Sequence, residues 1–305
     1  MFSVNLLILR VFVSSVGLVG NVCLILFIIQ TKSSHVKSFE LFLLGLAAAN
    51  LEEIVILNVY VTIVQTSAAT TSALWCRTLK FLTVCGEMAS ILFTVVISVY
   101  RYQKLRDAKR ANFPICLDGI RYAWMLSGAC VMFSVVISLP IYAITLQGSL
   151  ENITDSSNGC SQDFLECAKD YCPTLYRVYK YLFMPICYLL PIIIVTVSGC
   201  LIIVVLLNQE KMVAALDDVT CPNHHSQSHG HSLHRSTVAV VAAMWLFQVD
   251  WTLYLILLWT LNDFDSWMEI EFFISTSYSS ISPYVYGIGN NLFSVQHFKD
   301  LFLKL

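Results

Sequence analysis

Charge is scarce in this sequence. Lys, Arg, Asp and Glu together account for 12% of its 305 residues, whereas an average soluble domain is about a quarter charged. Hydrophobic residues account for 57% and the mean hydropathy is +0.71, so a water-soluble fold of this size could not bury all of its apolar surface. The composition therefore predicts one integral membrane domain over residues 1–305. The formal net charge of −2 is too small to indicate a nucleic-acid partner.

Sequence patterns of common enzyme classes are also missing. There is no Gly-rich phosphate loop, no His-Glu-x-x-His helix and no Gly-x-Ser-x-Gly elbow. A histidine-rich run at 223–231 has neither the fixed partner spacing nor the carboxylates of a metal site, so we expect a flexible cytoplasmic loop there. The sequence gives no reason to expect catalysis, a bound metal or a cofactor.

Long apolar stretches are abundant. A helix that crosses the hydrocarbon core, which is about 30 Å thick, needs roughly 20 mostly apolar residues. Seven stretches qualify: 4–29, 39–65, 77–100, 122–146, 176–207, 236–260 and 268–289. The seventh is the weakest in composition because Glu269 and Glu271 open it. We therefore predict an all-α bundle of seven transmembrane helices, the first of which is too long for a signal-peptide core.

The distribution of charge predicts the orientation. Lys and Arg concentrate after the first span and between the third and fourth spans, and the positive-inside rule makes these loops cytoplasmic. Acidic residues dominate the other side, which places the N-terminus outside and the C-terminus inside. Asn152-Ile153-Thr154 is a glycosylation sequon in a loop predicted to be outside. The segment 290–305 has the apolar and basic mixture of an interfacial helix on the inner leaflet.

Cysteines divide by predicted location. Four of the 11 fall on the outer side, where disulfides persist, and their spacing leaves the pairing open: Cys76, Cys160, Cys167 and Cys172. Cys116 and Cys221 are predicted to be cytoplasmic and reduced, and the other five lie within spans.

Charged groups occur inside several spans, where each needs a partner, a water-filled cavity or a function. In the third span, Arg77, Lys80 and Glu87 recur at helical spacing, which predicts one stripe facing the bundle interior. Lys80 and Glu87 are about 10 Å apart along the helix axis, too far for a direct ion pair. Glu53 and Asp250 are expected either to be hydrogen-bonded between helices, or protonated, or to serve a function.

These polar positions predict a ligand cavity between the third, sixth and seventh spans. A small amphipathic ligand with an aromatic ring and a charged group would suit it. Five side chains are candidates to line the cavity: Lys80, Glu87, Asp250, Tyr254 and Tyr278.

Short elements in a fixed order carry a resemblance. They are Gly20-Asn21, Leu46-Ala47-Ala48-Ala49-Asn50, Cys76 and Arg101 at the two ends of the third span, Trp124, and Ser282-Pro283-Tyr284-Val285-Tyr286. In order and spacing they resemble the landmarks of the rhodopsin-like G-protein-coupled receptors across nearly the whole chain. The resemblance implies a disulfide between Cys76 and Cys160, and an activation role for four residues: Asn21, Asn50, Pro283 and Tyr286.

The same resemblance implies a cytoplasmic surface that meets a G protein. Its members would be Arg101, Tyr102, Lys104 and Arg106. Arg101 follows Tyr100 rather than the acid usual in the family, so the usual local restraint on the arginine is missing. Either the basal activity is high or another group holds Arg101.

Departures from the family pattern indicate a subfamily. Asn50 replaces an aspartate, Ser282 replaces an asparagine, and no proline follows Met244-Trp245-Leu246-Phe247. These features resemble the vomeronasal type 1 receptors, and the run SVYRYQKLRD at 98–107 is most similar to their fish relatives, the olfactory receptors class A related. The resemblance implies a receptor for water-borne odorants or pheromones at the plasma membrane of olfactory sensory neurons, with a heterotrimeric G protein as its partner.

The charge of the ligand is open at this point. By analogy, carboxylated aromatics and bile-acid-like molecules are candidates, and their anion would meet Lys80 or Arg77 by charge-assisted hydrogen bonds. An amine would instead favour Glu87 or Asp250. A rhodopsin-like receptor for an amine, peptide or lipid is the main alternative. A transporter is a remote alternative, because transporters are built from internal repeats and the sequence shows no corresponding halves.

Overall fold

Seven long helices make up the described part of the chain. The computed structural model describes residues 2–30, 37–65, 73–107, 119–151, 178, 184–217, 227–260 and 267–290. The helices are α1 (Phe2–Gln30), α2 (Ser38–Gln65), α3 (Ala73–Asp107), α4 (Ile120–Glu151), α6 (Met184–Asp217), α7 (Gln227–Thr260) and α8 (Trp267–Gly289). Each overlaps one predicted apolar stretch, and these ranges contain no strand. The predicted all-α bundle is confirmed.

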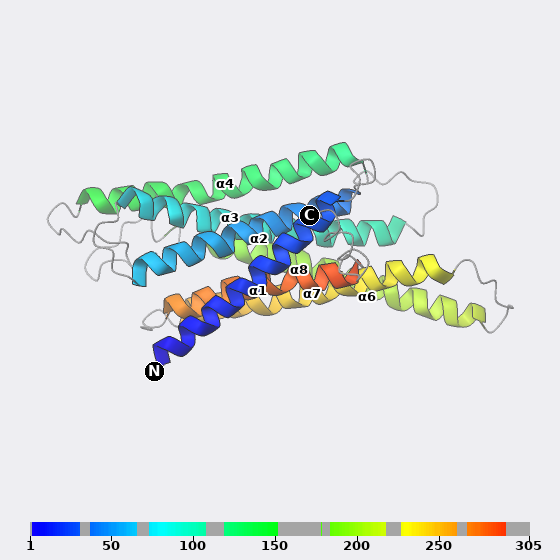
Figure 1. The fold of residues 1–305 in the computed structure, drawn as a ribbon. Helices are drawn as coiled ribbons and strands as arrows, with labels where there is room; N and C mark the ends of the chain where they lie inside the picture. The colour runs from blue at the N-terminus through cyan, green and yellow to red at the C-terminus, as the bar shows by residue number, and fades with distance from the viewer. Residues whose placement is uncertain are drawn as a thin grey trace.

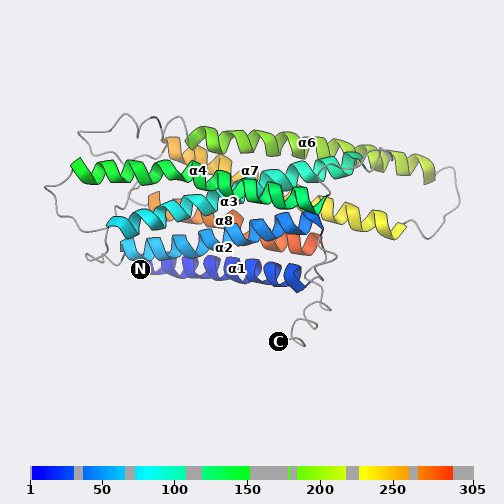
Figure 2. The same ribbon diagram turned by 90° about the horizontal axis from the view of Figure 1, so that it is seen from above.

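The helices run alternately in opposite directions (Figure 1). The first residues of α1, α3, α6 and α8 lie at one end of the bundle with the last residues of α2, α4 and α7. Because α3 carries Cys76 near its start and Arg101 near its end, we name the two ends the Cys76 end and the Arg101 end. At the Arg101 end, α6 and α7 extend beyond the other helices (Figure 2).

Six of the described helices are long and apolar enough to cross a membrane, and α8 is the one that is not. The composition of α8 has a structural reason. Its polar side chains point into the bundle, where Ser275, Ser279 and Ser282 are buried and α8 packs against α1, α2 and α7. The seventh stretch is thus weak as a hydropathy signal because its polar residues pair with other helices.

The helix α3 is central and α4 is peripheral. Within their most apolar segments, 72% of α3 is buried but only 28% of α4. α3 packs against α2, α4, α6 and α7. On α4, Trp124, Met132 and Phe133 are exposed on the outside of the bundle, where apolar side chains meet lipid tails.

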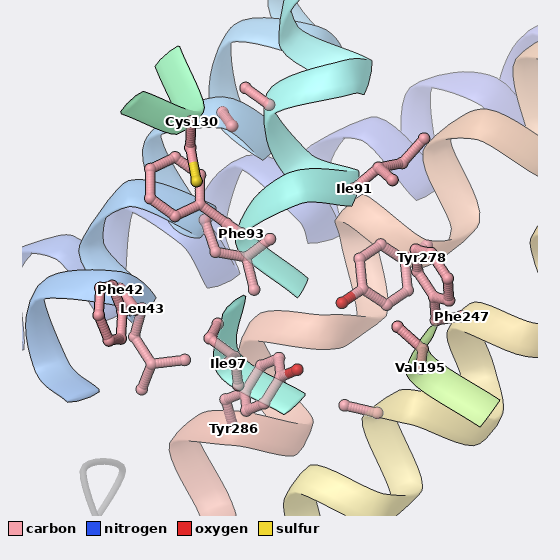
Figure 3. Close-up of a cluster of buried hydrophobic side chains, with 14 of the residues drawn as sticks. Phe42, Leu43, Ile91, Phe93, Ile97, Cys130, Val195, Phe247, Tyr278 and Tyr286 are labelled. Carbon is pink, nitrogen blue, oxygen red and sulfur yellow. The ribbon is translucent and has the colours of Figure 1, made fainter. Parts of the chain in front are cut away.

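Two glycines bring α2 and α3 close together. The ring of Phe93 occupies the space that a Cβ at Gly45 would need, and a Cβ at Gly86 would lie 3.2 Å from the backbone nitrogen of Glu53. A Cβ at Gly45 would collide with the Phe93 ring, and a Cβ at Gly86 would fit only if α2 moved by a few tenths of an ångström. The core around this contact includes Phe42 and Phe93, as Figure 3 shows.

One sequence expectation about a loop is partly wrong. Residues 227–231 of the histidine-rich run form the first turns of α7, while 223–226 lie outside the described residues. Extending an existing helix adds one hydrogen bond per residue, so polar residues continue it readily. In the described ranges, no group of three or more His, Cys, Asp or Glu side chains is placed to hold a metal ion.

Candidate ligand site and polar core

The charged stripe of α3 is buried, as its helical spacing predicts. Lys80 is 8% exposed and Glu87 is 6% exposed, while Arg77 is half-buried. The Lys80 ammonium lies 4.9 Å from the centre of the Tyr60 ring of α2, a cation–π contact. Lys80 therefore leans toward α2, whereas Glu87 turns to α6.

Glu87 takes part in an aromatic cluster near the Cys76 end. The Tyr188 hydroxyl of α6 donates a 2.8 Å hydrogen bond to Glu87 Oε1. The Tyr188 ring lies 5.2 Å from the ring of Trp251 and 5.1 Å from that of Tyr254, both on α7. We call Glu87, Tyr188, Trp251 and Tyr254 the aromatic-acid cluster. Sequence reasoning missed Tyr188, because nothing in its apolar run marks it as a partner of a carboxylate.

Two polar atoms beside this cluster lack hydrogen-bond partners. Asp250 is 9% exposed and Trp251 is 2% exposed. The buried atoms Asp250 Oδ2 and Trp251 Nε1 make no hydrogen bond. Ser277 of α8 is the hydrogen-bonding group that faces the Asp250 carboxyl. One residue thus offers an unused acceptor and the next an unused donor.

Tyr278 lies deeper than the cluster. Its hydroxyl is 2.7 Å from Thr94 Oγ1 of α3, and its ring meets Phe247 edge-on at 5.5 Å. Figure 3 shows Tyr278 beside Phe247, with Ile91 and Val195 close by. Of the five side chains predicted to line one cavity, the structure brings Glu87 and Tyr254 into one cluster with Asp250 next to it on α7. It places Lys80 against α2 and Tyr278 in the packed core.

Glu53 is buried with both carboxylate oxygens hydrogen-bonded. Ser275 donates to Oε1 at 2.5 Å and Ser279 donates to Oε2 at 2.7 Å, both from α8. The side chain is fully buried, and Gly86 allows α3 to pack beside it. Interhelical hydrogen bonding, one of the alternatives set out for Glu53, is present in the structure.

Two of the predicted activation residues, Asn21 and Asn50, meet in a hydrogen-bonded network one turn toward the Arg101 end. Asn50 donates to Ser282 Oγ at 3.1 Å and accepts from Ser90 at 2.7 Å. Asn21 donates to the Ser279 carbonyl at 2.9 Å. The network joins α1, α2, α3 and α8. Pro283 and Tyr286 are buried on the next turns of α8.

Arg101 is held by neutral groups at the other end of α3. Its guanidinium donates to Ser236 Oγ of α7 at 2.5 Å and to Asn290 Oδ1 at 3.0 Å. Ser236 in turn donates to Asn290 Oδ1 at 2.6 Å, and the guanidinium lies 3.5 Å from the centre of the Phe39 ring. We call this set the Arg101 clamp. It answers the question that Tyr100 raised, because another group does hold the arginine.

The other predicted coupling residues surround the clamp unevenly. Tyr102 and Lys104 are half-buried and Arg106 is exposed. Lys104 Nζ donates to the Tyr100 hydroxyl at 3.1 Å. Of the four predicted coupling residues, Arg106 is the one whose side chain is exposed.

A buried arginine near the Cys76 end was missed at the sequence level. Arg10 of α1 donates to Thr62 Oγ1 at 2.6 Å and to the Asn58 carbonyl at 3.4 Å, both on α2. Its guanidinium lies 5.4 Å from the centre of the Phe272 ring of α8. A single charge inside an otherwise apolar run was the signal that could have found it.

Two tryptophans of α7 differ in position. Trp245, in the run without a following proline, is 64% exposed and faces away from the bundle. Trp251, one and a half turns later, packs 6.2 Å from the Phe247 ring in the interior. Among the outer-side predictions, Cys76 is disulfide-bonded. Cys160 and Asn152 lie outside the described residues, so the Cys76–Cys160 pairing and the glycosylation stay predictions.

Comparison with known proteins bears on the whole bundle. Residues 20–286 match the family model of the 7 transmembrane receptor (rhodopsin family). A stretch of 140 residues is 33% identical to the probable G protein-coupled receptor 85 of Danio rerio. This stretch covers 43% of the present chain and 37% of that protein. The matched stretch therefore spans little more than a third of the relative's length.

The matched range begins at Gly20 and ends at Tyr286, and it contains the Asn21–Asn50 network, the aromatic-acid cluster and Arg101. Members of this family are multi-pass membrane proteins that signal through G proteins and are not enzymes. The chain belongs to the rhodopsin family of seven-transmembrane receptors.

Proposed function

We propose that this receptor is chemosensory. It binds a small water-borne odorant or pheromone in the half of the bundle nearest the Cys76 end and activates a heterotrimeric G protein at the Arg101 end. The observation that carries the proposal is the aromatic-acid cluster. Two atoms in and beside it have no hydrogen-bond partner: Nε1 of Trp251, which belongs to the cluster, and Oδ2 of Asp250, which precedes Trp251 on α7. Family membership supports the receptor function, and the vomeronasal-like departures in the sequence support the chemosensory role.

The orientation belongs to the same proposal. The Cys76 end is extracellular and the Arg101 end cytoplasmic, with the N-terminus outside. Asn152 is then glycosylated and Cys160 is the disulfide partner of Cys76. The basic residues Lys104 and Arg106 lie at the G-protein side, in accord with the positive-inside rule.

A continuous set of contacts supports coupling between the two ends. Trp251 packs against Phe247, and Phe247 packs against Tyr278 of α8. Tyr278 meets Thr94 of α3. On α7, Trp251 and Ser236 belong to one continuous helix and lie about 22 Å apart at 1.5 Å per residue. A shift of α7 at the cluster therefore moves the Ser236 contact of the Arg101 clamp.

A ligand acts only through its unequal affinity for two states of the bundle. In the described state Arg101 is sequestered by Ser236 and Asn290. A ligand that binds better when α7 has moved away from α3 would release Arg101 toward the G protein. The clamp is thus the switch element, and the cluster is the element that the ligand biases.

The test is a G-protein activation assay on the expressed receptor. Pools of carboxylated aromatics, bile-acid-like compounds and amines are applied to the native receptor and to Lys80→Ala and Glu87→Ala. Arg121→Ala, which removes an exposed charge of α4, is the control variant. A response to one pool that Glu87→Ala or Lys80→Ala abolishes and Arg121→Ala preserves supports the proposal. A surface-expressed receptor that answers no small molecule contradicts the chemosensory role.

A further inference from the structure

We infer that Phe39 of α2 is a positioning residue for Arg101, because the face of its ring restrains the guanidinium in the described state of the bundle. Tyr100 takes part indirectly: it stands where the family usually has an acid, and it fixes the Phe39 ring for that task. The inference rests on the proposed function, in which Arg101 is released toward the G protein, and it identifies what sets the ease of that release.

The Phe39 ring and the Arg101 guanidinium are in direct contact inside the bundle. The guanidinium carbon lies 3.5 Å from the ring centre, which is the separation of two flat groups stacked on each other. Phe39 is 6% exposed and Arg101 is 7% exposed, so little water competes for the cation. A cation–π contact is strongest where the cation is desolvated. The stack is therefore a substantial part of what holds Arg101.

The ring and the polar groups of the Arg101 clamp hold different parts of the guanidinium. Ser236 and Asn290 accept hydrogen bonds from its N–H groups, which point outward in the guanidinium plane. The Phe39 ring covers a face of that plane. These contacts do not compete, so Arg101 is held at once from α2, from α7 and from the residue that follows α8.

Phe39 is the member of the clamp that lies on α2. The helices α2 and α3 pack closely at Gly45 and Gly86, so we expect them to move together. A shift of α7 removes the Ser236 hydrogen bond but leaves the Phe39 ring against Arg101. The energy of the stack then determines how readily the arginine turns to the G protein, and a weaker stack favours the active state.

Tyr100 holds the Phe39 ring in place. The two rings are stacked with their centres 6.1 Å apart and an angle of 19° between their planes. Phe42, one turn further along α2, meets the Tyr100 ring edge-on at 5.6 Å. Tyr100 is fully buried, and Lys104 donates a 3.1 Å hydrogen bond to its hydroxyl. A neutral phenol cannot form the ion pair that a carboxylate forms with the next residue, so Tyr100 contributes through Phe39.

A fluorinated series at position 39 tests the stack with little change in the size of the ring. Phenylalanine with one, two or three ring fluorines replaces Phe39 by nonsense suppression, and each fluorine withdraws electron density from the face that attracts the cation. We expect basal G-protein activation, normalised to surface expression, to rise stepwise to about three- to tenfold. The melting temperature of the purified receptor should fall in the same order. The same series at Phe133, an exposed residue of α4, is the control.

Leucine variants test the role of Tyr100. Phe39→Leu removes the aromatic face and should raise the basal signal at least as much as three fluorines do. Tyr100→Leu removes the stacked ring and should raise it less, because Phe39 loses its support but is still present. The double variant should match Phe39→Leu alone, since Tyr100 can act through Phe39 only while that ring is there. Tyr100→Phe keeps the ring and should stay close to the native receptor.

The outcomes separate this inference from the proposed function. A rise with Phe39→Leu that fluorination does not reproduce shows that Phe39 only fills space, and it overturns the inference. Additive effects of Phe39→Leu and Tyr100→Leu overturn the role of Tyr100. If the combined variant Ser236→Ala and Asn290→Ala raises the basal signal but the fluorinated receptors do not, the inference fails and the proposed switch stands. If no change in the clamp alters basal or ligand-driven activation, the proposed switch fails and the inference with it.

Discussion

Glu53 and Asp250 are both acidic residues buried in the same bundle, but their surroundings differ. Glu53 receives a hydrogen bond on each oxygen from the serines of α8, whereas Oδ2 of Asp250 receives none. From the sequence the two are alike, since each is an acid inside a mostly apolar span. The structure shows that one carboxylate fastens helices together and that the other keeps an unused acceptor. A buried charge is therefore an indicator of function only after its partners have been counted.

Removal of Glu53 should have the largest effect on stability. In Glu53→Ala the hydroxyls of Ser275 and Ser279 lose their acceptor, and a space opens beside Gly86. We expect the free energy of unfolding to fall by about 2–4 kcal/mol, measured by thermal or denaturant unfolding of the purified receptor in detergent. Glu52→Ala is the matched control, with an expected change within about 0.5 kcal/mol. An unchanged stability of Glu53→Ala would erase the distinction between the two carboxylates.

The Arg101 clamp extends the comparison to a cation. Arg101 is hydrogen-bonded, like Glu53, but its partners Ser236 and Asn290 are neutral. Ser236 lies in the first turns of α7, and Asn290 directly follows α8. Such a contact can be exchanged between two states more readily than a buried ion pair. The combined variant Ser236→Ala and Asn290→Ala removes hydrogen bonds to a charged group worth about 1.5–3 kcal/mol.

We therefore expect basal G-protein activation by that variant to rise about tenfold if the active state is a minor one, because 1.4 kcal/mol changes an equilibrium tenfold. Basal activation is measured without ligand and normalised to surface expression. Thr237→Ala, on the neighbouring residue, is the control. A basal signal equal to that of the native receptor would mean that the clamp does not restrain the inactive state.

The sequence predicts the scaffold better than the site, and particular residues show why. Apolar length predicts all seven helices, and helical spacing predicts that Lys80 and Glu87 are buried. Partnerships between helices are not encoded in local spacing, so Tyr188 as the partner of Glu87 and Ser236 as a partner of Arg101 were not foreseen. Arg10 is a different case. A charged residue inside the apolar first span already indicates a buried polar contact, but the sequence does not encode its partners on α2. The orientation of Lys80 toward Tyr60 likewise depends on α2, not on the α3 stripe.

The link between Glu87 and Tyr188 tests an intermediate case, a carboxylate that accepts a hydrogen bond from a tyrosine hydroxyl of another helix. Tyr188→Phe keeps the ring contacts with Trp251 and Tyr254 and removes the donor. We expect a loss of about 1–2 kcal/mol, because a hydrogen bond to a charged group is lost and the carboxylate is less well satisfied. Unfolding of the purified variant measures the loss. Tyr122→Phe, which alters an exposed tyrosine of α4, should show no change, and a similar loss there would mean that the assay reports hydroxyl removal in general.

The smallest effect, and the sharpest form of the comparison, is expected from isosteric amides at the two acids. Glu53→Gln replaces one of two used acceptors by an NH₂ group that faces a serine, so stability should fall by about 1–2 kcal/mol. Asp250→Asn removes a buried charge whose Oδ2 is unpaired, so the loss of desolvation penalty offsets any lost contact with Ser277. Its stability should therefore change by less than about 1 kcal/mol, and an increase is the favoured direction. Both variants are measured without ligand by thermal unfolding at the same detergent and salt concentration. If Asp250→Asn were destabilised as strongly as Glu53→Gln, Asp250 would be a structural acid, and its assignment to a ligand would lose its physical basis.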